Sequence, residues 1–180
     1  MGETNGVNQK VSSTGLNFGV MLNKELVSKN DTDLLFGFGL RYAINTFRNN
    51  RFLSVVDSIQ ATQLNVYDAL ISRSSYSLSS RFVELPSELR LRHYGNEGVI
   101  RFSLGALIGA RERIVERARI EASPYVQDAY PDANTFRYGV FIRLGIKSIA
   151  VYAGYYLNPI FKSPSSSKLN ILNLGINLAL

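Results

Sequence analysis

The sequence predicts an all-β fold: a closed, eight-stranded, antiparallel up-and-down transmembrane β-barrel over residues 15–180, preceded by a flexible polar tail at 1–14. Three observations predict it. Apolar residues alternate with polar or small ones at period two, and helical periodicity is almost absent. The connections alternate between tight and long, as an up-and-down barrel requires. One face of the predicted strands is apolar and aromatic, whereas the other carries glycine and arginine.

Eight segments carry the alternation. In 136–146, for example, Phe136 and Val140 lie on the apolar face and Arg137 and Arg143 on the other. Segment 52–62 has the weakest pattern, because Asp57 interrupts its apolar face. The predicted strands are 16–25, 34–47, 52–62, 82–92, 99–111, 136–146, 149–158 and 172–180.

The connections predict how neighbouring strands pair. A two-residue turn at Lys147-Ser148 places Ile142 opposite Ala153. A turn at Asn49-Asn50 would likewise place Ile44 opposite Val55 and insert segment 52–62 as the third strand. The predicted tight turns are 49–50, 94–98 and 147–148, and the long loops are 26–32, 63–79, 112–134 and 159–168. Short turns at one end and long loops at the other predict that both termini lie at the turn end, in the periplasm.

The distribution of glycine decides which face points outward. Nine of the 14 glycines lie on the polar face, at 19, 37, 39, 105, 109, 139, 145, 154 and 175. Glycine is costly on a solvated strand face but useful inside a narrow barrel, where bulky neighbours need room. The apolar face would aggregate if it met water. We therefore expect it to face lipid; the alternative is a soluble, lipocalin-like barrel with an apolar cavity.

Composition excludes several classes of site. The chain has 180 residues, 46% hydrophobic and only 19% charged, which is too apolar for a disordered protein. It has no cysteine and one histidine, so thiol chemistry and histidine-rich metal centres are excluded, and no cofactor is expected. There is no apolar run of about 18 residues for a transmembrane helix. The polar start, Met-Gly-Glu, suggests a mature exported chain with an added initiator methionine.

The inward face predicts a charged network that plugs the lumen. Glu84 and Glu88 are four residues apart, so period-two alternation places both on the same face of their strand. Inward arginines would neutralise them. Part of the net charge of +6 is then interior, which argues against nucleic-acid binding. The predicted network comprises Arg41, Glu84, Glu88, Arg90, Arg101, Arg143, Tyr152 and Tyr156.

Catalysis is the less favoured interpretation of these residues. A glycosidase needs two carboxyl groups in an open cleft, and a narrow lumen offers none. His93, the only histidine and so the only candidate general base of that type, is expected in a solvated turn beside Glu97, and no serine is fixed near it. The sequence therefore predicts a non-enzymatic barrel with no catalytic or metal site.

Two polar residues interrupt the outward apolar face. Asp57 lies between Val55 and Ile59, and Ser87 lies on the next predicted strand. A charge facing lipid is costly. Both residues are candidate partner-facing positions, where a larger envelope protein would cover the defect; the alternative is that a bulge turns Asp57 inward. The mixed charges of 112–134 suggest a hairpin above the membrane that either binds a partner or is simply solvated.

Three stretches resemble one known family. Phe82–Arg90 (Phe-Val-Glu-Leu-Pro-Ser-Glu-Leu-Arg) is similar to a strand of PorT-type outer-membrane barrels of Bacteroidota. Gly15-Leu16-Asn17 resembles their opening Gly-x-Asn, and Tyr155–Lys162 their penultimate strand running into a loop. The size is similar to that of OmpX and OmpA barrels. The resemblance implies location in the bacterial outer membrane, contact with its lipid, and an accessory or structural role in a larger envelope complex such as secretion or transport machinery. The alternative is a surface-exposed binding or adhesion barrel that acts through its loops.

Overall fold

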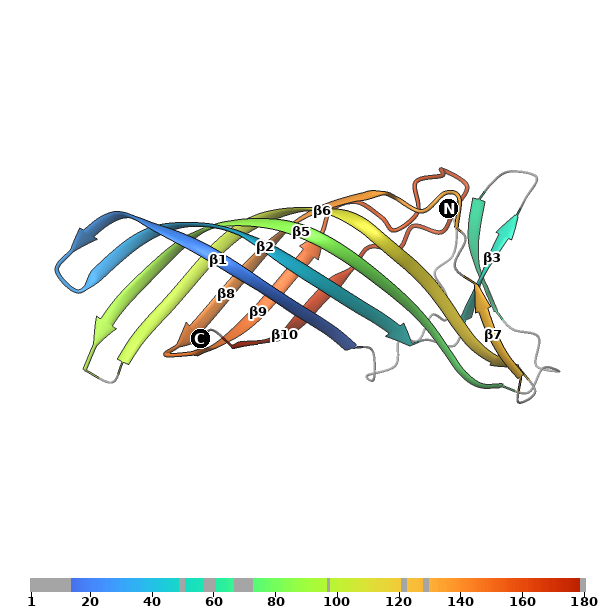
Figure 1. The fold of residues 1–180 in the computed structure, drawn as a ribbon, viewed down its shortest axis with the longest axis horizontal. Helices are drawn as coiled ribbons and strands as arrows, with labels where there is room; N and C mark the ends of the chain where they lie inside the picture. Colours follow the sequence, from blue (N-terminus) through green and yellow to red (C-terminus); the bar gives the residue numbers. More distant parts are fainter. Residues whose placement is uncertain are drawn as a thin grey trace.

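The structure, a computed structural model, describes residues 14–48, 51–56, 61–66, 73–96, 98–120, 123–127 and 130–178 (Figure 1). The described chain is all β, as predicted. Its strands are β1 (Thr14–Lys29), β2 (Thr32–Arg48), β3 (Arg51–Val56), β4 (Ala61–Val66), β5 (Arg73–Gly95), β6 (Gly98–Ile120), β7 (Ser123–Gln127), β8 (Phe136–Ile146), β9 (Ile149–Tyr156) and β10 (Leu172–Leu178). No helix among these residues is long and apolar enough to cross a bilayer.

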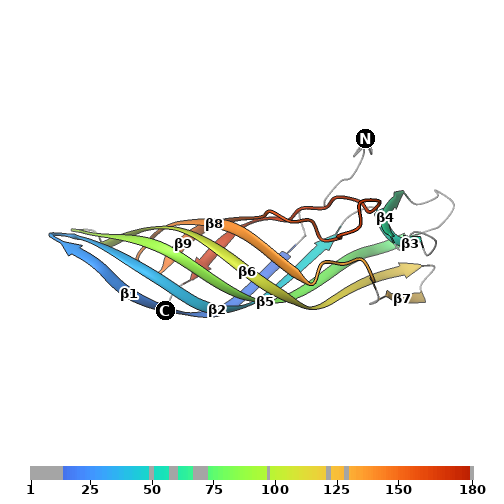
Figure 2. The same cartoon turned by 90° about the horizontal axis from the view of Figure 1, so that it is seen from above.

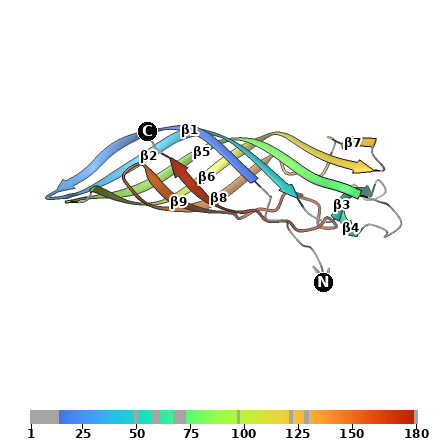
Figure 3. The same ribbon diagram turned by 90° about the horizontal axis from the view of Figure 1, so that it is seen from below.

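One antiparallel sheet dominates the fold. Its strands follow the order β1-β2-β5-β6-β8-β9-β10, and β7 adds to β6 beside this path. The sheet curls so that β1 and β2 lie on one side of an interior and β8 and β9 on the other (Figures 2 and 3). Among the described strands, β1 pairs only with β2 and β10 only with β9, so the sheet is open and the predicted closure is not observed.

The two ends of the sheet differ. One end, here called the turn end, carries the reversals at 30–31 and 147–148 and the paired ends of β5 and β6 at Gly95 and Gly98. The other, here called the loop end, carries 130–135 and 157–171. Asn30 and Lys147 have φ of 51° and 53°, the left-handed conformation of tight hairpin turns. β3, β4 and β7 lie beyond the loop end (Figures 1 and 2).

Pairing of β8 with β9 confirms one predicted register. Ile142 lies opposite Ala153, Val140 opposite Tyr155 and Arg143 opposite Tyr152. The two-residue turn at 147–148 determines this alignment, because it leaves no other pairing for the flanking residues.

The predicted third strand is wrong. β2 pairs directly with β5, so that Ile44 lies opposite Arg81 rather than Val55. β3 pairs with β4 in a separate two-stranded sheet, and residues 57–60 lie outside the described residues. The predicted turn residues 49–50 also lie outside them, and the strands on either side belong to different sheets.

A second correction concerns the first hairpin and the termini. The predicted long loop 26–32 is mostly strand: β1 continues to Lys29 after a register shift between Glu25 and Val27. Asn30 and Asp31 then form a tight turn into β2. β1 therefore starts at the loop end, whereas β10 finishes at the turn end. The prediction that the sheet both begins and ends at the turn end is wrong for β1.

The apolar face points outward and the polar face inward. Exposed apolar side chains cover the outer side of all seven strands of the path, among them Phe18, Phe36, Leu85, Leu104, Val140, Val151 and Leu174. The inner face buries Glu84, Glu88, Arg41, Arg137, Tyr152 and Tyr156. This distribution is the reverse of a soluble sheet, which buries its apolar side.

Candidate functional site

Glu84 is the centre of the buried inner face. Its side chain is 0% exposed and accepts hydrogen bonds from Arg41 Nε and Arg137 Nε, both at 2.6 Å. The Tyr156 hydroxyl donates a third, at 2.8 Å. These partners come from β2, β8 and β9, so one carboxylate on β5 joins four strands across the interior. Charged hydrogen bonds of this kind are stronger than neutral ones and are costly to leave incomplete.

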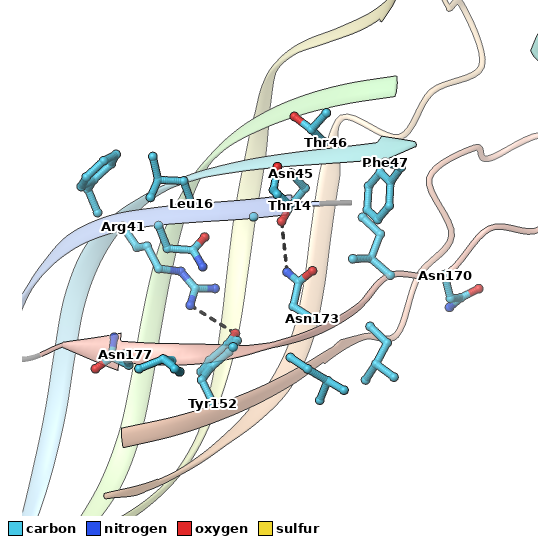
Figure 4. Close-up of a pocket in the computed structure, with 18 of the residues that line it drawn as sticks. Thr14, Leu16, Arg41, Asn45, Thr46, Phe47, Tyr152, Asn170, Asn173 and Asn177 are labelled. Atoms are coloured by element: carbon cyan, nitrogen blue, oxygen red, sulfur yellow. Dashed lines mark hydrogen bonds between the residues drawn. The ribbon is translucent and has the colours of Figure 1, made fainter. Parts of the chain in front are cut away.

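Arg41 spans the interior from β2 to β9. Its Nη1 lies 3.2 Å from the Tyr152 hydroxyl and its Nη2 lies 3.4 Å from that of Tyr156 (Figure 4 shows the first bond). Arg137, on β8, stacks its guanidinium over the rings of Phe82 and Tyr156, 3.6 and 4.1 Å from their centroids. Planar guanidinium groups suit this combination of ion pairing and stacking.

A glycine makes room for the central carboxylate. Gly109 on β6 lies opposite Glu84, and a Cβ atom there would lie 2.7 Å from Glu84 Cγ. The inward glycine thus permits a bulky neighbour, which is the physical reason that glycine gathers on this face.

Glu88 forms a second ionic group, nearer the turn end. Its side chain is 2% exposed. Arg90 Nε donates to it at 3.0 Å, and Arg143 Nη2 lies 3.2 Å from its Oε2. The structure thus places two arginines around each of these two glutamates, so the two groups together carry an excess of positive charge.

Arg101 stands apart from the other residues of the predicted network. Within the described residues, neither glutamate forms an ion pair with it, and its Nε is buried without a hydrogen-bond partner. It lies opposite Arg92 on β5 and Gly145 on β8. The structure therefore brings together Arg41, Glu84, Tyr152 and Tyr156 in one group, and Glu88, Arg90 and Arg143 in another.

Only one of the two candidate partner-facing residues is among the described residues. Asp57 lies outside the described residues. Ser87 lies half-buried on the outer side of β5, between exposed Leu85 and Leu89. Its neighbours across the sheet are Phe38 on β2 and Ala106 on β6, so the strand expected to carry Asp57 beside it is elsewhere.

His93 is exposed at the turn end, where its Nδ1 lies 3.1 Å from Thr32 Oγ1. Glu97 lies outside the described residues. No group of three or more metal-ligating side chains occurs in the described ranges. Both interior glutamates are held by guanidinium groups, so neither is positioned as a free acid or base facing a substrate cleft.

A cavity lies where the sheet is open. It has a volume of about 830 Å³ and is lined by β1, β2, β9 and β10, with Arg41 and Tyr152 at its inner wall (Figure 4). Asn173 Nδ2 donates to Asn45 Oδ1 at 3.1 Å and crosses it from β10 to β2.

A cluster of polar side chains around Asp132, here called the loop-end knot, lies at the loop end, and sequence reasoning missed it. Asp132 accepts hydrogen bonds from the Thr62 backbone N–H at 2.9 Å, from the Thr62 hydroxyl and from the Ser166 hydroxyl. Burial alone would raise the pKa of Asp132, but the bonds from Ser166 and Thr62 outweigh it and hold the pKa below the usual 3.8. Tyr130 and Phe161 pack beside this knot with ring centroids 5.8 Å apart.

No protein-family profile, curated protein or solved structure matches this chain. The resemblance to PorT-type barrels therefore stays a prediction.

Proposed function

We propose that this chain forms the wall of a non-enzymatic β-barrel in a bacterial outer membrane, as an accessory or structural subunit of a larger envelope complex. The observation that carries the proposal is the outer apolar face, which continues around all seven strands of the sheet while charges are buried inside. In water this arrangement would be unfavourable; in lipid it is the expected one.

The height of the apolar surface fits a bilayer. On β8, the outward residues from Phe136 to Ile146 are all exposed and apolar or aromatic. A strand of 11 residues, tilted by roughly 40° with a rise of about 3.3 Å per residue, spans about 25 Å along the membrane normal. That is the height of the apolar band of outer-membrane barrels.

Polar residues mark the edges of this surface. At the loop side, the Tyr42 hydroxyl donates to exposed Glu112 on the outer face. At the turn end, His93 and Lys147 are exposed. Because outer-membrane barrels keep short turns in the periplasm, we assign the turn end to the periplasm and the loop end to the cell surface.

The filled interior favours a structural role over transport. Arg41, Glu84 and Tyr156 connect opposite walls directly through hydrogen bonds, so bulky side chains occupy the interior at that level. We propose that a barrel wall with such a filled interior serves to dock to a larger envelope complex.

A surface-binding barrel is the second candidate, and one observation favours it. β5 and β6 continue past Glu112 at the loop end, and β7 adds to β6 there. This three-stranded extension offers a surface beyond the apolar face to an external ligand.

Membrane fractionation tests the proposal. The chain should sediment with outer membranes, require detergent for extraction, and migrate on gels as a compact band whose mobility changes on heating. A monodisperse, detergent-free monomer in water would reject the membrane role. If the tagged protein extracted in mild detergent carries a large complex with it, the accessory role is supported; a lone barrel would support surface binding instead.

A further inference from the structure

Arg92 on β5 and Arg101 on β6 lie directly opposite each other in the ladder, near the turn end of the sheet. Period-two alternation places both on the inner face, with Glu88 and Ser103, and both are partly exposed. Like charges directly opposite each other in an antiparallel pair destabilise a sheet. The two guanidinium groups therefore need negative charge beside them.

Two other pairs of inward arginines each share a glutamate. Glu84 binds Arg41 and Arg137. Glu88 does the same with the pair formed by Arg90 and Arg143. Arg92 and Arg101 form a third pair, and within the described residues no carboxylate forms an ion pair with either of them.

The neighbours in the same row of the sheet do not supply the missing charge. Beyond Arg101, the row continues through small or neutral residues: Gly145, Ala150 and Asn177. On the other side, Arg92 lies opposite Asp33 on β2. Asp33 Oδ1 accepts a hydrogen bond from the Ser28 hydroxyl at 2.6 Å, and Asp33 is the one carboxylate in this row of the described strands.

Both arginines also have unused hydrogen-bond donors. The Nε atoms of Arg92 and Arg101 are buried and have no hydrogen-bond partner among the described residues. A buried donor without an acceptor is costly, and a guanidinium group binds an oxyanion through two parallel hydrogen bonds. A single oxyanion between the two side chains would satisfy both donors and remove the repulsion.

The charges near the turn end indicate the class of this anion. Four inward arginines lie there, at positions 90, 92, 101 and 143, together with the two carboxylates of Glu88 and Asp33, which leaves a formal excess of two positive charges. A phosphate group carries a charge of about −1.5 to −2 at pH 7 and has several strong acceptor oxygens. A single carboxylate would neutralise only half of the excess.

We propose that Arg92 and Arg101 form a binding site for a phosphate group that enters the interior from the turn end. The two residues lie three ladder positions from Gly95 and Gly98, where the β5–β6 pair ends, so a soluble anion reaches them without passing Glu84. The inference uses ladder positions, charges and unpaired donors, and it does not depend on the proposed location in a membrane.

Calorimetry with inorganic phosphate tests the site, on the full chain in a non-ionic detergent and at an ionic strength held constant with chloride. We expect wild type to bind phosphate saturably. Arg101→Gln and Arg92→Gln should each weaken binding by about tenfold or more, because each removes a charged donor. Arg101→Lys should have an intermediate affinity, since it keeps the charge but loses the planar fork.

Lys147→Gln is the matched control. Lys147 is an exposed cation at the same end of the sheet, so its replacement should leave the affinity for phosphate unchanged. Equal weakening by Lys147→Gln and Arg101→Gln would overturn the inference, because it would indicate attraction by the general positive field. Absence of saturable binding to wild type would also overturn it.

Urea midpoints show whether the variant folds and provide a second readout. Without phosphate, Arg101→Gln should be at least as stable as wild type, because the substitution relieves repulsion from Arg92. Added phosphate should raise the midpoint of wild type more than that of the variant. Comparison of the two chains cancels the general stabilising effect of phosphate salts. A less stable variant without phosphate, or equal increases with phosphate, would contradict the proposal.

Other probes define the ligand. Acetate that binds as tightly as phosphate would overturn the assignment to a phosphate group. Comparison of inorganic phosphate with glycerol 3-phosphate distinguishes a free ion from a phosphorylated molecule as its source.

Glu97 lies outside the described residues, and Glu97→Gln tests whether the chain supplies the anion itself. Phosphate binding to this variant but not to wild type would overturn the inference. The proposed function is tested separately: a phosphate-binding chain recovered outside the membrane fraction would contradict the membrane role and leave the phosphate site standing.

Discussion

Glu84 on β5 lies directly opposite Arg41 on β2 in the ladder of the sheet, and the same carboxylate also binds Arg137, which lies two strands away on β8. The first pair is set by strand register alone. The second reaches across Gly109 on β6, which lies between Glu84 and Arg137 in the same row of the sheet. A single carboxylate thus joins β2, β5 and β8.

Replacing Glu84 by glutamine should destabilise the protein strongly. Glu84→Gln keeps the shape but leaves Arg41 and Arg137 without their anionic partner, and breaking a buried ion pair costs about 3 kcal/mol or more. Urea midpoints of protein refolded in detergent micelles measure the change. Glu25→Gln, an exposed glutamate on β1, is the control and should match wild type. Equal midpoints for both variants would remove Glu84 from the stabilising network.

The register between β2 and β5 can be tested with engineered disulfides, since the chain has no cysteine of its own. Phe36→Cys combined with Leu89→Cys places the two thiols opposite each other and should oxidise to a disulfide. Ile44→Cys with Val55→Cys, the pair expected from a turn at 49–50, should stay reduced. Non-reducing gels and thiol counting distinguish the two, and the reverse result would reinstate β3 as the neighbour of β2.

Asn30 should tolerate glycine but not valine. Its φ of 51° is left-handed, it is exposed, and no packing is lost on substitution. Asn30→Val should cost about 1–2 kcal/mol, because a β-branched residue is strained in that region. Asn30→Gly should be neutral or slightly stabilising. Urea midpoints again provide the measurement, and similar midpoints for the two variants would argue against a left-handed turn here.

Acid should weaken the loop-end knot through Asp132. Its pKa is lowered in the folded protein relative to 3.8, so its stabilisation is fully present above about pH 4 and is lost as the pH falls through the lower native pKa. Asp132→Asn removes the charge at every pH. The fall in urea midpoint between pH 7 and pH 3 should therefore be larger for wild type than for the variant. Equal falls would show that Asp132 does not titrate as part of the knot.

The sequence was sufficient to predict strand character and the inward or outward direction of most side chains, because period-two alternation determines the face of each residue. It did not determine which strands pair. Sliding one strand by two residues leaves every side chain on the same face, so Ile44 finds an apolar neighbour in several registers. Only a tight turn such as 147–148 removes that ambiguity.

The first hairpin was hidden by a local irregularity. The register shift between Glu25 and Val27 interrupts the alternation, so β1 seemed to end where it only changes phase. The Asn30-Asp31 dipeptide was the signal for a turn.

The interior groups were only partly predictable for a related reason. Alternation places Glu84, Arg41 and Tyr156 on one face, but it does not determine that Arg41 lies opposite Glu84 or that Tyr156 reaches the same carboxylate from β9. The contact of Asp132 with Thr62 and Ser166 joins three segments far apart in sequence. The sequence predicts Asp132 and Ser166 in long loops and Thr62 at the end of a strand, and no pattern brings the three together.

For the proposed membrane barrel, the arrangement around Glu84 has a consequence for assembly. A bilayer that took up β8 and β9 without β5 would meet the guanidinium of Arg137 without its carboxylate partner, and an unpaired buried charge is costly. We therefore expect these strands to come together before, or during, their entry into the hydrocarbon layer.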